Sequence, residues 1–215
     1  MKLLDRLDYK FGRHTIHGLM LYIIIGMGIV YISDLFLYPQ IGITLSQLFA
    51  FDRAAIFSGQ IWRIVTFIFL PPDTSLIFII FVLYFYWLIG TALENTWGSF
   101  RFNVYYFVGV LGTALAGLLT GYATNYYLNL SLFFAFAALY PDFEVRLFFF
   151  LPLKIKWLAL LDAVFFLISV IFNSWGGRIA MLVALANFFL FFWGDFIQTI
   201  RSWNRKRKFN RDFRR

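Results

Sequence analysis

Long apolar stretches with almost no charged residues recur along this chain and are separated by short polar or proline-containing segments. There are six of them, at about residues 18–33, 74–93, 102–121, 128–141, 157–173 and 179–194. Most approach the ~20 residues that a helix needs to cross the hydrocarbon region of a bilayer. The pattern therefore predicts an all-α protein with six membrane-spanning helices, of which the fourth is short.

The connection after the first span is long and unusually apolar. The first span is expected to end at about Ser33, with Asp34 at its outer end, and residues 35–73 contain too many Leu, Phe and Ile residues for a solvated loop. We expect a short helix at about Leu45–Phe57 within the outer leaflet, and a break at Pro71 and Pro72 before the second span. The connection is thus predicted to be a large external loop embedded in the membrane.

Prolines also divide the stretch between the fourth and fifth spans. The fourth helix should end at Tyr140, before Pro141, and Phe148–Leu151 should return to the membrane surface without crossing it. Lys154 and Lys156 then anchor the start of the fifth helix. In the third span, Gly117 and Gly121 form a small-xxx-small step that allows close helix packing, so this span is expected at the centre of the bundle.

Composition agrees with a membrane protein. The chain is 61% hydrophobic and 23% aromatic, with a mean hydropathy of +0.75, whereas soluble domains are about 45 to 50% apolar. Cysteine is absent, which excludes disulfides and thiolate chemistry. Residues 1–17 alternate charged with apolar positions and lack a cleavage site, so they predict an amphipathic interfacial segment and no cleavable signal peptide.

Positive charge predicts the orientation. If the N-terminus is cytoplasmic and there are six spans, most Lys and Arg residues fall in cytoplasmic segments, as the positive-inside rule requires. Both termini are therefore expected inside, with a membrane domain at 18–200 and a basic tail at 201–215. The eight basic residues of the tail should attract anionic lipid headgroups or fix the topology. Nucleic acid is not an expected partner, because these residues follow a membrane span.

One segment resembles the rhomboid superfamily. It contains Gly-Gln-x-Trp-Arg, then an apolar span, then Gly-x-x-x-Glu-x-x-x-Gly. The residues concerned are Gly59, Gln60, Trp62, Arg63, Gly90, Glu94 and Gly98. The resemblance implies a six-helix bundle in which the Trp-Arg pair lies near the outer membrane surface and the Glu and Gly close the cytoplasmic end. An architectural role for Trp62 and Arg63 and direct contact with a partner both remain open. Glu94 is expected to pair with Arg101 or to accept backbone N–H groups.

The groups that an active rhomboid uses are missing at the corresponding positions. The oxyanion-stabilising His and Asn positions fall near Phe78 and Val82, neither of which can donate a hydrogen bond. Ser131 has no adjacent glycine, and the nucleophile position falls close to Tyr126. Arg178 stands where the basic His belongs, and a guanidinium stays protonated.

Histidine content gives the same answer without any alignment. The two histidines, His14 and His17, precede the first span, and no lysine lies between Lys10 and Lys154. Neither a Ser-His nor a Ser-Lys pair can therefore form at the outer depth of the bundle. His14 and His17 lie three residues apart, but without a clear third ligand they do not predict a metal site. The sequence thus predicts a protein that is not an enzyme and needs no cofactor.

Two acids are associated with predicted spans, Asp162 within the fifth and Asp195 near the inner end of the sixth. Intramembrane ionisable residues are candidates for function, although pairing of Asp162 with Lys154 or Lys156, or helix-end hydrogen bonding, is the favoured interpretation.

The resemblance without the catalytic groups is typical of rhomboid pseudoproteases such as the derlins and inactive rhomboids. Phe150-Leu151-Pro152 adds to the derlin similarity, while the derlin glycine motif of the sixth span is not evident. We expect a multi-pass protein, in the plasma membrane if the chain is bacterial, that binds transmembrane clients or partners and thins the bilayer locally. The alternatives are an intramembrane protease with a non-standard nucleophile such as Ser131, and a small transporter that uses Asp162.

Overall fold

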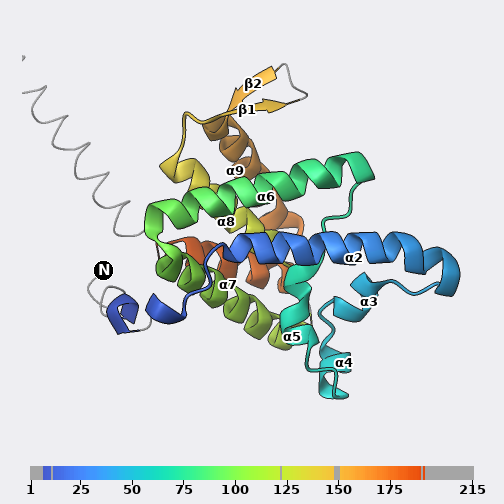
Figure 1. Cartoon of the computed structure of the whole chain (residues 1–215). Helices are drawn as coiled ribbons and strands as arrows, with labels where there is room; N and C mark the ends of the chain where they lie inside the picture. The colour runs from blue at the N-terminus through green and yellow to red at the C-terminus, as the bar shows by residue number, and fades with distance from the viewer. Residues whose placement is uncertain (1–6, 11, 122, 148–150, 190, 192–215) are drawn as a thin grey trace, which may run out of the picture.

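The computed structural model describes residues 7–10, 12–121, 123–147, 151–189 and 191, and its elements are shown in Figure 1. In the described part of the chain, four helices are long and apolar enough to cross a membrane. They are α2 (Leu19–Ile41), α6 (Leu76–Trp97), α7 (Ser99–Thr120) and α9 (Ile155–Phe172). Two shorter apolar helices, α8 (Tyr126–Leu139) and Trp175–Phe189, accompany them. The mainly helical membrane protein that the sequence predicts is therefore confirmed at this level.

The first helix is longer than predicted. It continues past Ser33 to Ile41, and Asp34 lies inside it. The Asp34 carboxylate accepts the backbone N–H groups of Leu45 and Ser46, which begin the next helix. A charge that looked like the end of a span is stable within the helix, because it supplies the acceptor for the unpaired donors of a neighbouring helix.

The connection between α2 and α6 folds into short helices. These are α3 (Leu45–Phe49), α4 (Arg53–Phe57), α5 (Arg63–Thr66) and the 3₁₀ turn η2 (Phe67–Phe69). The single helix predicted at Leu45–Phe57 is thus two helices. Thr44 and Gln47 form a capping box at the start of α3, and the Asp52 side chain accepts the Ala55 N–H at the start of α4. Asp52 therefore begins a second helix at a point where the apolar pattern predicted one continuous helix.

α7 forms the centre of the bundle, but the predicted Gly117–Gly121 step is not where other spans approach it. A methyl group at Gly117 would meet Ala123 and Phe51, and Gly121 ends α7 with φ of +85° and no described neighbour within 4 Å of an added methyl group. The inner face of α7 carries Phe102, Tyr105 and Tyr106, which are fully buried. A methyl group added at Gly109 would meet the ends of the Leu128 and Asn187 side chains, which would have to shift, so α8 and the helix Trp175–Phe189 approach α7 closely at this glycine. α6 packs between α2, α7 and α8 (Figure 1).

A β-hairpin separates α8 from α9 and departs from the all-α prediction. Its strands β1 (Glu144–Leu147) and β2 (Leu151–Lys154) are antiparallel, with Glu144 opposite Lys154. Pro152 is tolerated because a two-stranded sheet consists of edge strands alone. The predicted return of Phe148–Leu151 to the membrane surface falls largely on residues 148–150, outside the described part.

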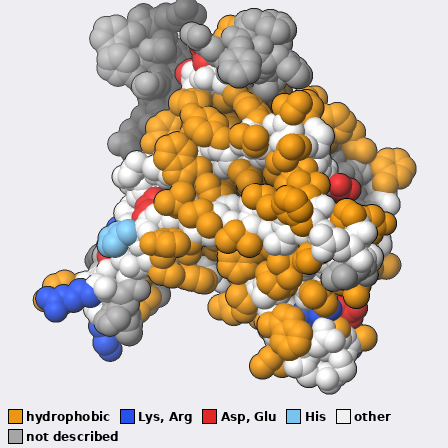
Figure 2. Space-filling view, turned by 45° about the vertical axis from the view of Figure 1, so that its right-hand side comes forward, with side chains coloured by type: hydrophobic (Ala, Val, Ile, Leu, Met, Phe, Trp, Pro, Cys, Tyr) orange, Lys and Arg blue, Asp and Glu red, His pale blue; other side chains and the backbone are white. Residues whose placement is uncertain are grey.

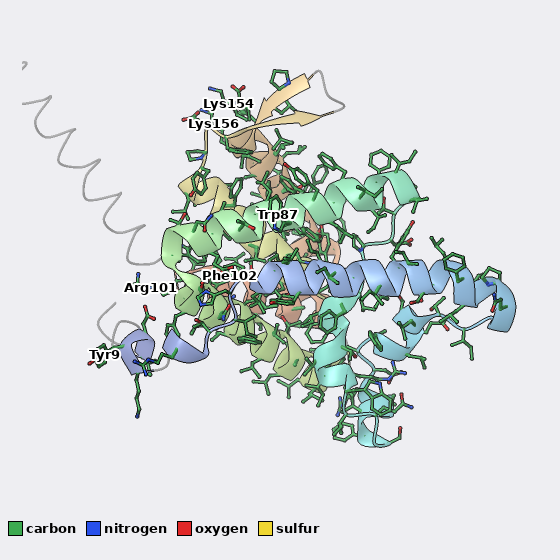
Figure 3. All side chains as sticks on the ribbon, in the orientation of Figure 1. Tyr9, Trp87, Arg101, Phe102, Lys154 and Lys156 are labelled. Carbon is green, nitrogen blue, oxygen red and sulfur yellow. The ribbon has the colours of Figure 1, made fainter. Side chains whose placement is uncertain are left out.

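Apolar side chains cover most of the face seen in Figure 2, and charged side chains lie near its rim. In the N-terminal segment predicted to be interfacial, residues 7–10 are helical and Gly12–His14 form a 3₁₀ turn. Tyr9 there is almost fully exposed and points away from the bundle (Figure 3).

Candidate functional site

Arg63 organises the connection after α2. Its guanidinium donates to the backbone oxygens of Gln47 and Ala50, at 2.8 and 2.7 Å, and to Gln60 Oε1 at 2.7 Å. The side chain is only 8% exposed. It satisfies carbonyl groups at the end of α3 that have no partner within the helix, which only a forked donor can do at several sites together. These contacts are architectural.

The rest of the Gly-Gln-x-Trp-Arg motif forms the turn that leads into α5. Gly59 has φ of +107°, a conformation that favours glycine, and its N–H donates to the Ile56 oxygen. Trp62 precedes α5 with about half of its surface exposed, and Phe57 and Ile61 beside it are more exposed still. The motif therefore has a polar, buried side formed by Arg63 and Gln60 and an apolar, exposed side.

Glu94 joins the start of α2 to the junction of α6 and α7. Its carboxylate accepts the Gly18 N–H, at 2.9 and 3.1 Å, and the Ser99 hydroxyl at 2.6 Å. His17 Nδ1 lies 2.9 Å from the same hydroxyl oxygen. The Gly18 N–H is a backbone donor of the kind predicted for Glu94. Its bonds to Glu94 hold α2 against the junction of α6 and α7 and so close one end of the bundle.

The two glycines of the second motif fit this junction. A side chain at Gly90 would collide with Met20 of α2, and Gly98 links α6 to α7 with φ of +84°. Glycine is required at Gly90 for helix approach and at Gly98 for backbone conformation. At the start of α7, Phe102 points into the bundle, with Arg101 beside it (Figure 3).

The positions that would carry proteolysis have other contacts. Ser131 is buried, donates to the Leu128 oxygen at 2.7 Å and accepts the Tyr105 hydroxyl at 2.9 Å. Arg178 donates to the Ile171 oxygen at 2.8 Å and lies 5.5 Å above the Trp175 ring. Phe78 is half exposed on α6. The Ser131 hydroxyl thus acts as a hydrogen-bonding link between α7 and α8.

Sequence reasoning missed the buried polar side chains that join the helices. Asn125 donates to the oxygens of Ile68 and Leu70 and fixes the chain before Pro71. Asn187 donates to the Tyr105 oxygen at 3.2 Å, and Asn129 hydrogen-bonds with Tyr86. Asparagine within an apolar stretch is the signal that could have identified them, because a polar group in hydrocarbon needs a partner.

Asp142, absent from the sequence-based candidates, holds both lysines near α9. Lys156 Nζ lies 2.7 Å and Lys154 Nζ 3.6 Å from its Oδ1 atom, and Figure 3 shows the two lysines together beside the hairpin. The hydrogen bond and positive charge of Lys156 hold the pKa of the exposed Asp142 carboxyl below its usual value. The predicted pairing of Asp162 with Lys154 or Lys156 is therefore wrong. Both lysines pair with Asp142, which lies just before the hairpin, and the hairpin brings Asp142 close to them.

Asp162 faces a small cavity between helices. The cavity, of about 40 Å³, is lined by the polar side chains of Tyr126, Asp162 and Ser169 and by apolar side chains that include Met181. It brings together residues of α8, α9 and the helix Trp175–Phe189. The other predicted intramembrane acid, Asp195, and the basic tail at 201–215 lie outside the described residues.

Two further cavities continue along the same helices. One of about 20 Å³ adjoins Ser131 and Phe166, and a wider groove of about 480 Å³ is shared by Phe166 and Lys156. We call this line of three cavities the α9 seam. It borders α9 from the level of Tyr126, where α8 begins, to that of Ala138, close to where α8 ends. Between these cavities, the Phe166 ring packs on Tyr127 and Phe134, and Asn173 donates to the Tyr127 hydroxyl at 2.9 Å.

Small residues are among those that line the wide groove. Ala137 and Ala138 come from α8, Ala159 and Ala163 from α9, together with larger side chains such as Leu167. Small residues in a groove let another helix approach closely. Among the described residues, no three His, Cys, Asp or Glu side chains are grouped to bind a metal ion.

Comparisons with protein-family models, curated proteins and solved structures find no match for this chain.

Proposed function

We propose that this chain is a non-catalytic, rhomboid-like membrane protein that binds transmembrane segments of client or partner proteins in the wide groove of the α9 seam. The observation that carries the proposal is this groove of about 480 Å³ between α8, α9 and the helix Trp175–Phe189, with alanines among its lining residues. Within a bilayer such a groove is filled by hydrocarbon or by another helix, since water does not fill an apolar site of this kind. Small residues favour the helix, because helices associate in lipid through close packing.

The proposed topology has six spans with both termini on the cytoplasmic side. Helices occur at all six apolar stretches, and the positive charge of residues 1–17 and 201–215 supports this orientation. α8 is the short span, because 14 residues at 1.5 Å each give about 21 Å against a hydrocarbon thickness of about 30 Å. If the chain is bacterial, the membrane is the plasma membrane.

Local thinning of the bilayer is part of the proposed mechanism. The short α8 lines the groove, and exposed apolar side chains such as Phe57, Ile61 and Trp62 stand on the connection after α2. A bilayer that adjusts to a short span lowers the cost of a client helix with polar or short segments, by fractions of a kcal/mol per Å. In this proposal the groove binds the client helix, and the thinner bilayer around α8 favours client helices with polar or short segments.

Site-specific photocrosslinking in native membranes tests the proposal. A photoreactive residue at Leu167, in the groove, is expected to crosslink to the membrane span of another protein, identified by mass spectrometry of the joined peptides. The same residue at Ile77, which is exposed on α6, is the matched control. Ala163→Trp should fill the groove and abolish the Leu167 crosslink. Crosslinks to lipid alone, or equal yields at both positions, would contradict the proposal.

Absence of catalysis has its own test. Labelling of membranes with a fluorophosphonate probe should leave the chain unmodified, because the Ser131 hydroxyl is buried and hydrogen-bonded to Leu128 and Tyr105. Labelling that disappears in Ser131→Ala would instead establish a protease.

A further inference from the structure

The cavity at Asp162 is lined by polar side chains that have no role in the proposed binding of a partner helix. It is small, about 40 Å³, and lies between α8, α9 and the helix Trp175–Phe189. Three of its lining side chains carry oxygen: the Asp162 carboxylate, the Ser169 hydroxyl and the Tyr126 hydroxyl. The rest, among them Leu130, Phe166 and Met181, are apolar.

No cation balances Asp162 among the described residues that face it. From α8 the titratable group at the cavity is Tyr126, which is neutral at ordinary pH, and the helix Trp175–Phe189 contributes Met181. Arg178 of that helix donates to the Ile171 oxygen and lies over Trp175. Lys154 and Lys156, at the β2 end of α9, are paired with Asp142.

A carboxylate without a counter-charge at this depth is costly, and two occupants could remove the cost: a proton or a small metal cation. Hard cations such as Ca²⁺ and Mg²⁺ take about six or more oxygen ligands. This cavity offers the oxygens of only three side chains, and the helical carbonyls are already used within the helices. A proton needs only the carboxylate and a hydrogen-bond acceptor, which Tyr126, Ser169 or a water can provide.

The cavity has room for that water. A buried water requires about 10 to 15 Å³ and two to four polar partners, and both conditions are met. Tyr126 is the first residue of α8 and is largely exposed, so the cavity lies beside the end of the bundle where protons can enter from the interface.

We propose that Asp162, Tyr126 and Ser169 form an intramembrane proton-binding site between α8 and α9. One proton adds to the Asp162 carboxylate to give a neutral carboxyl group, which then donates a hydrogen bond within the cavity while its carbonyl oxygen accepts another. A bond from this carboxyl group to the Tyr126 hydroxyl, directly or through a water, links α9 to α8 at the α9 seam. The site is independent of the client groove, so loss of either leaves the other measurable.

Infrared spectroscopy of the whole chain in nanodiscs tests the site directly. At pH 6, about two units above the ordinary aspartic acid pKa of about 3.9, the wild type should show the C=O band of a protonated carboxyl that is missing from Asp162→Asn. The matched control Asp142→Asn removes an exposed acid and should leave the band unchanged. If Asp162→Asn and wild type have the same carboxyl band from pH 5 to 8, the proposal is overturned.

Two further arms keep the test decisive. Ser169→Ala retains the acid and should weaken proton affinity about tenfold, which moves the midpoint of the band by about one pH unit towards acid; a purely structural serine would not move it. Sodium chloride compared with choline chloride at fixed pH should have no effect. Loss of the band in sodium alone would overturn the proton assignment in favour of a sodium site. Leu167 crosslinking should persist in Asp162→Asn.

Discussion

α7 and α9 are both apolar helices long enough to span a bilayer, but they differ in how much of each is buried inside the protein. In the most hydropathic part of α7, 56% of residues are buried inside the protein, whereas the corresponding share for α9 is 11%. α9 is also the more hydropathic of the two, with a mean of 2.2 against 1.6. The less apolar helix is the buried one, because in lipid it is polar and small side chains, not hydrophobicity, that bring helices together.

The contacts of the two helices follow this rule. α7 presents Gly109, Tyr105 and Asn103 to its neighbours, while α9 presents Leu161, Phe165 and Ile168 largely to the outside. α7 is therefore the buried centre of the bundle, whereas α9 leaves cavities against α8 along the seam. A partner helix or a protonation event has the greatest effect where the packing is weakest.

The largest expected difference between the two helices is the effect of truncating a large side chain. Phe102→Ala in α7 should destabilise the fold by about 3 kcal/mol, because the fully buried ring leaves a cavity. Leu161→Ala in α9 should change stability by less than about 0.5 kcal/mol, since lipid replaces the lost contacts. Thermal unfolding in one detergent measures both. Equal losses would mean that α9 is packed as tightly as α7.

Enlarging a small residue should give a similar but smaller contrast. Gly109→Val places a side chain against Leu128 and Asn187, and overpacking of this kind costs about 1 to 3 kcal/mol. Ala163→Val adds volume in the wide groove and should be nearly neutral. The measurement is the fraction of monodisperse protein after heating, followed by gel filtration. A large loss for Ala163→Val would show that the groove is closed in solution.

The hydrogen bond between α7 and α8 sharpens the comparison further. Tyr105→Phe removes the donor to Ser131 and should cost about 0.6 kcal/mol, the average for such bonds within membranes. A double-mutant cycle with Ser131→Ala isolates this term, and the exposed Tyr84→Phe is the control. A coupling energy of zero would show that the hydrogen bond between Tyr105 and Ser131 does not contribute to the central position of α7.

The smallest effect is expected at the start of α9 and depends on pH. The pKa of Asp142 is lowered in the folded protein, so its stabilising pairing with Lys156 is complete above the ordinary aspartic acid pKa and is lost as pH falls through the lowered value. The protection factors of the Ile155 and Lys156 amides, which are corrected for the intrinsic exchange rate at each pH, should therefore fall in acid, while those of α7 stay constant. Asp142→Asn should show the lower protection at every pH; unchanged protection would assign the anchoring to the backbone bonds of Phe143 and Pro141 alone.

The sequence alone determined where helices form and which of them is central. Six apolar stretches coincide with helices, because a chain in hydrocarbon must satisfy its backbone internally. The abundance of glycine marked α7 as the central helix, although its contacts with other spans are at Gly109 and Gly112 and not at the predicted Gly117–Gly121 step. Boundaries set by a single charge were less certain. Asp34 indicated the end of the first span, but it lies inside α2 and accepts the N–H groups at the start of α3. The strands of the β-hairpin, Glu144–Leu147 and Leu151–Lys154, showed no clear alternation of apolar and polar residues in the sequence.

Only the tertiary structure decided which polar groups meet. Glu94 with Gly18, Arg63 with the carbonyls of α3, and Asp142 with Lys156 are pairings between segments whose separation along the chain carries no signal of contact. The same holds for the α9 seam, since nothing in the sequences of α8 and α9 marks where cavities remain between them. Hydropathy records the preference of a residue for lipid, but the packing of small and polar side chains determines which helices the lipid surrounds.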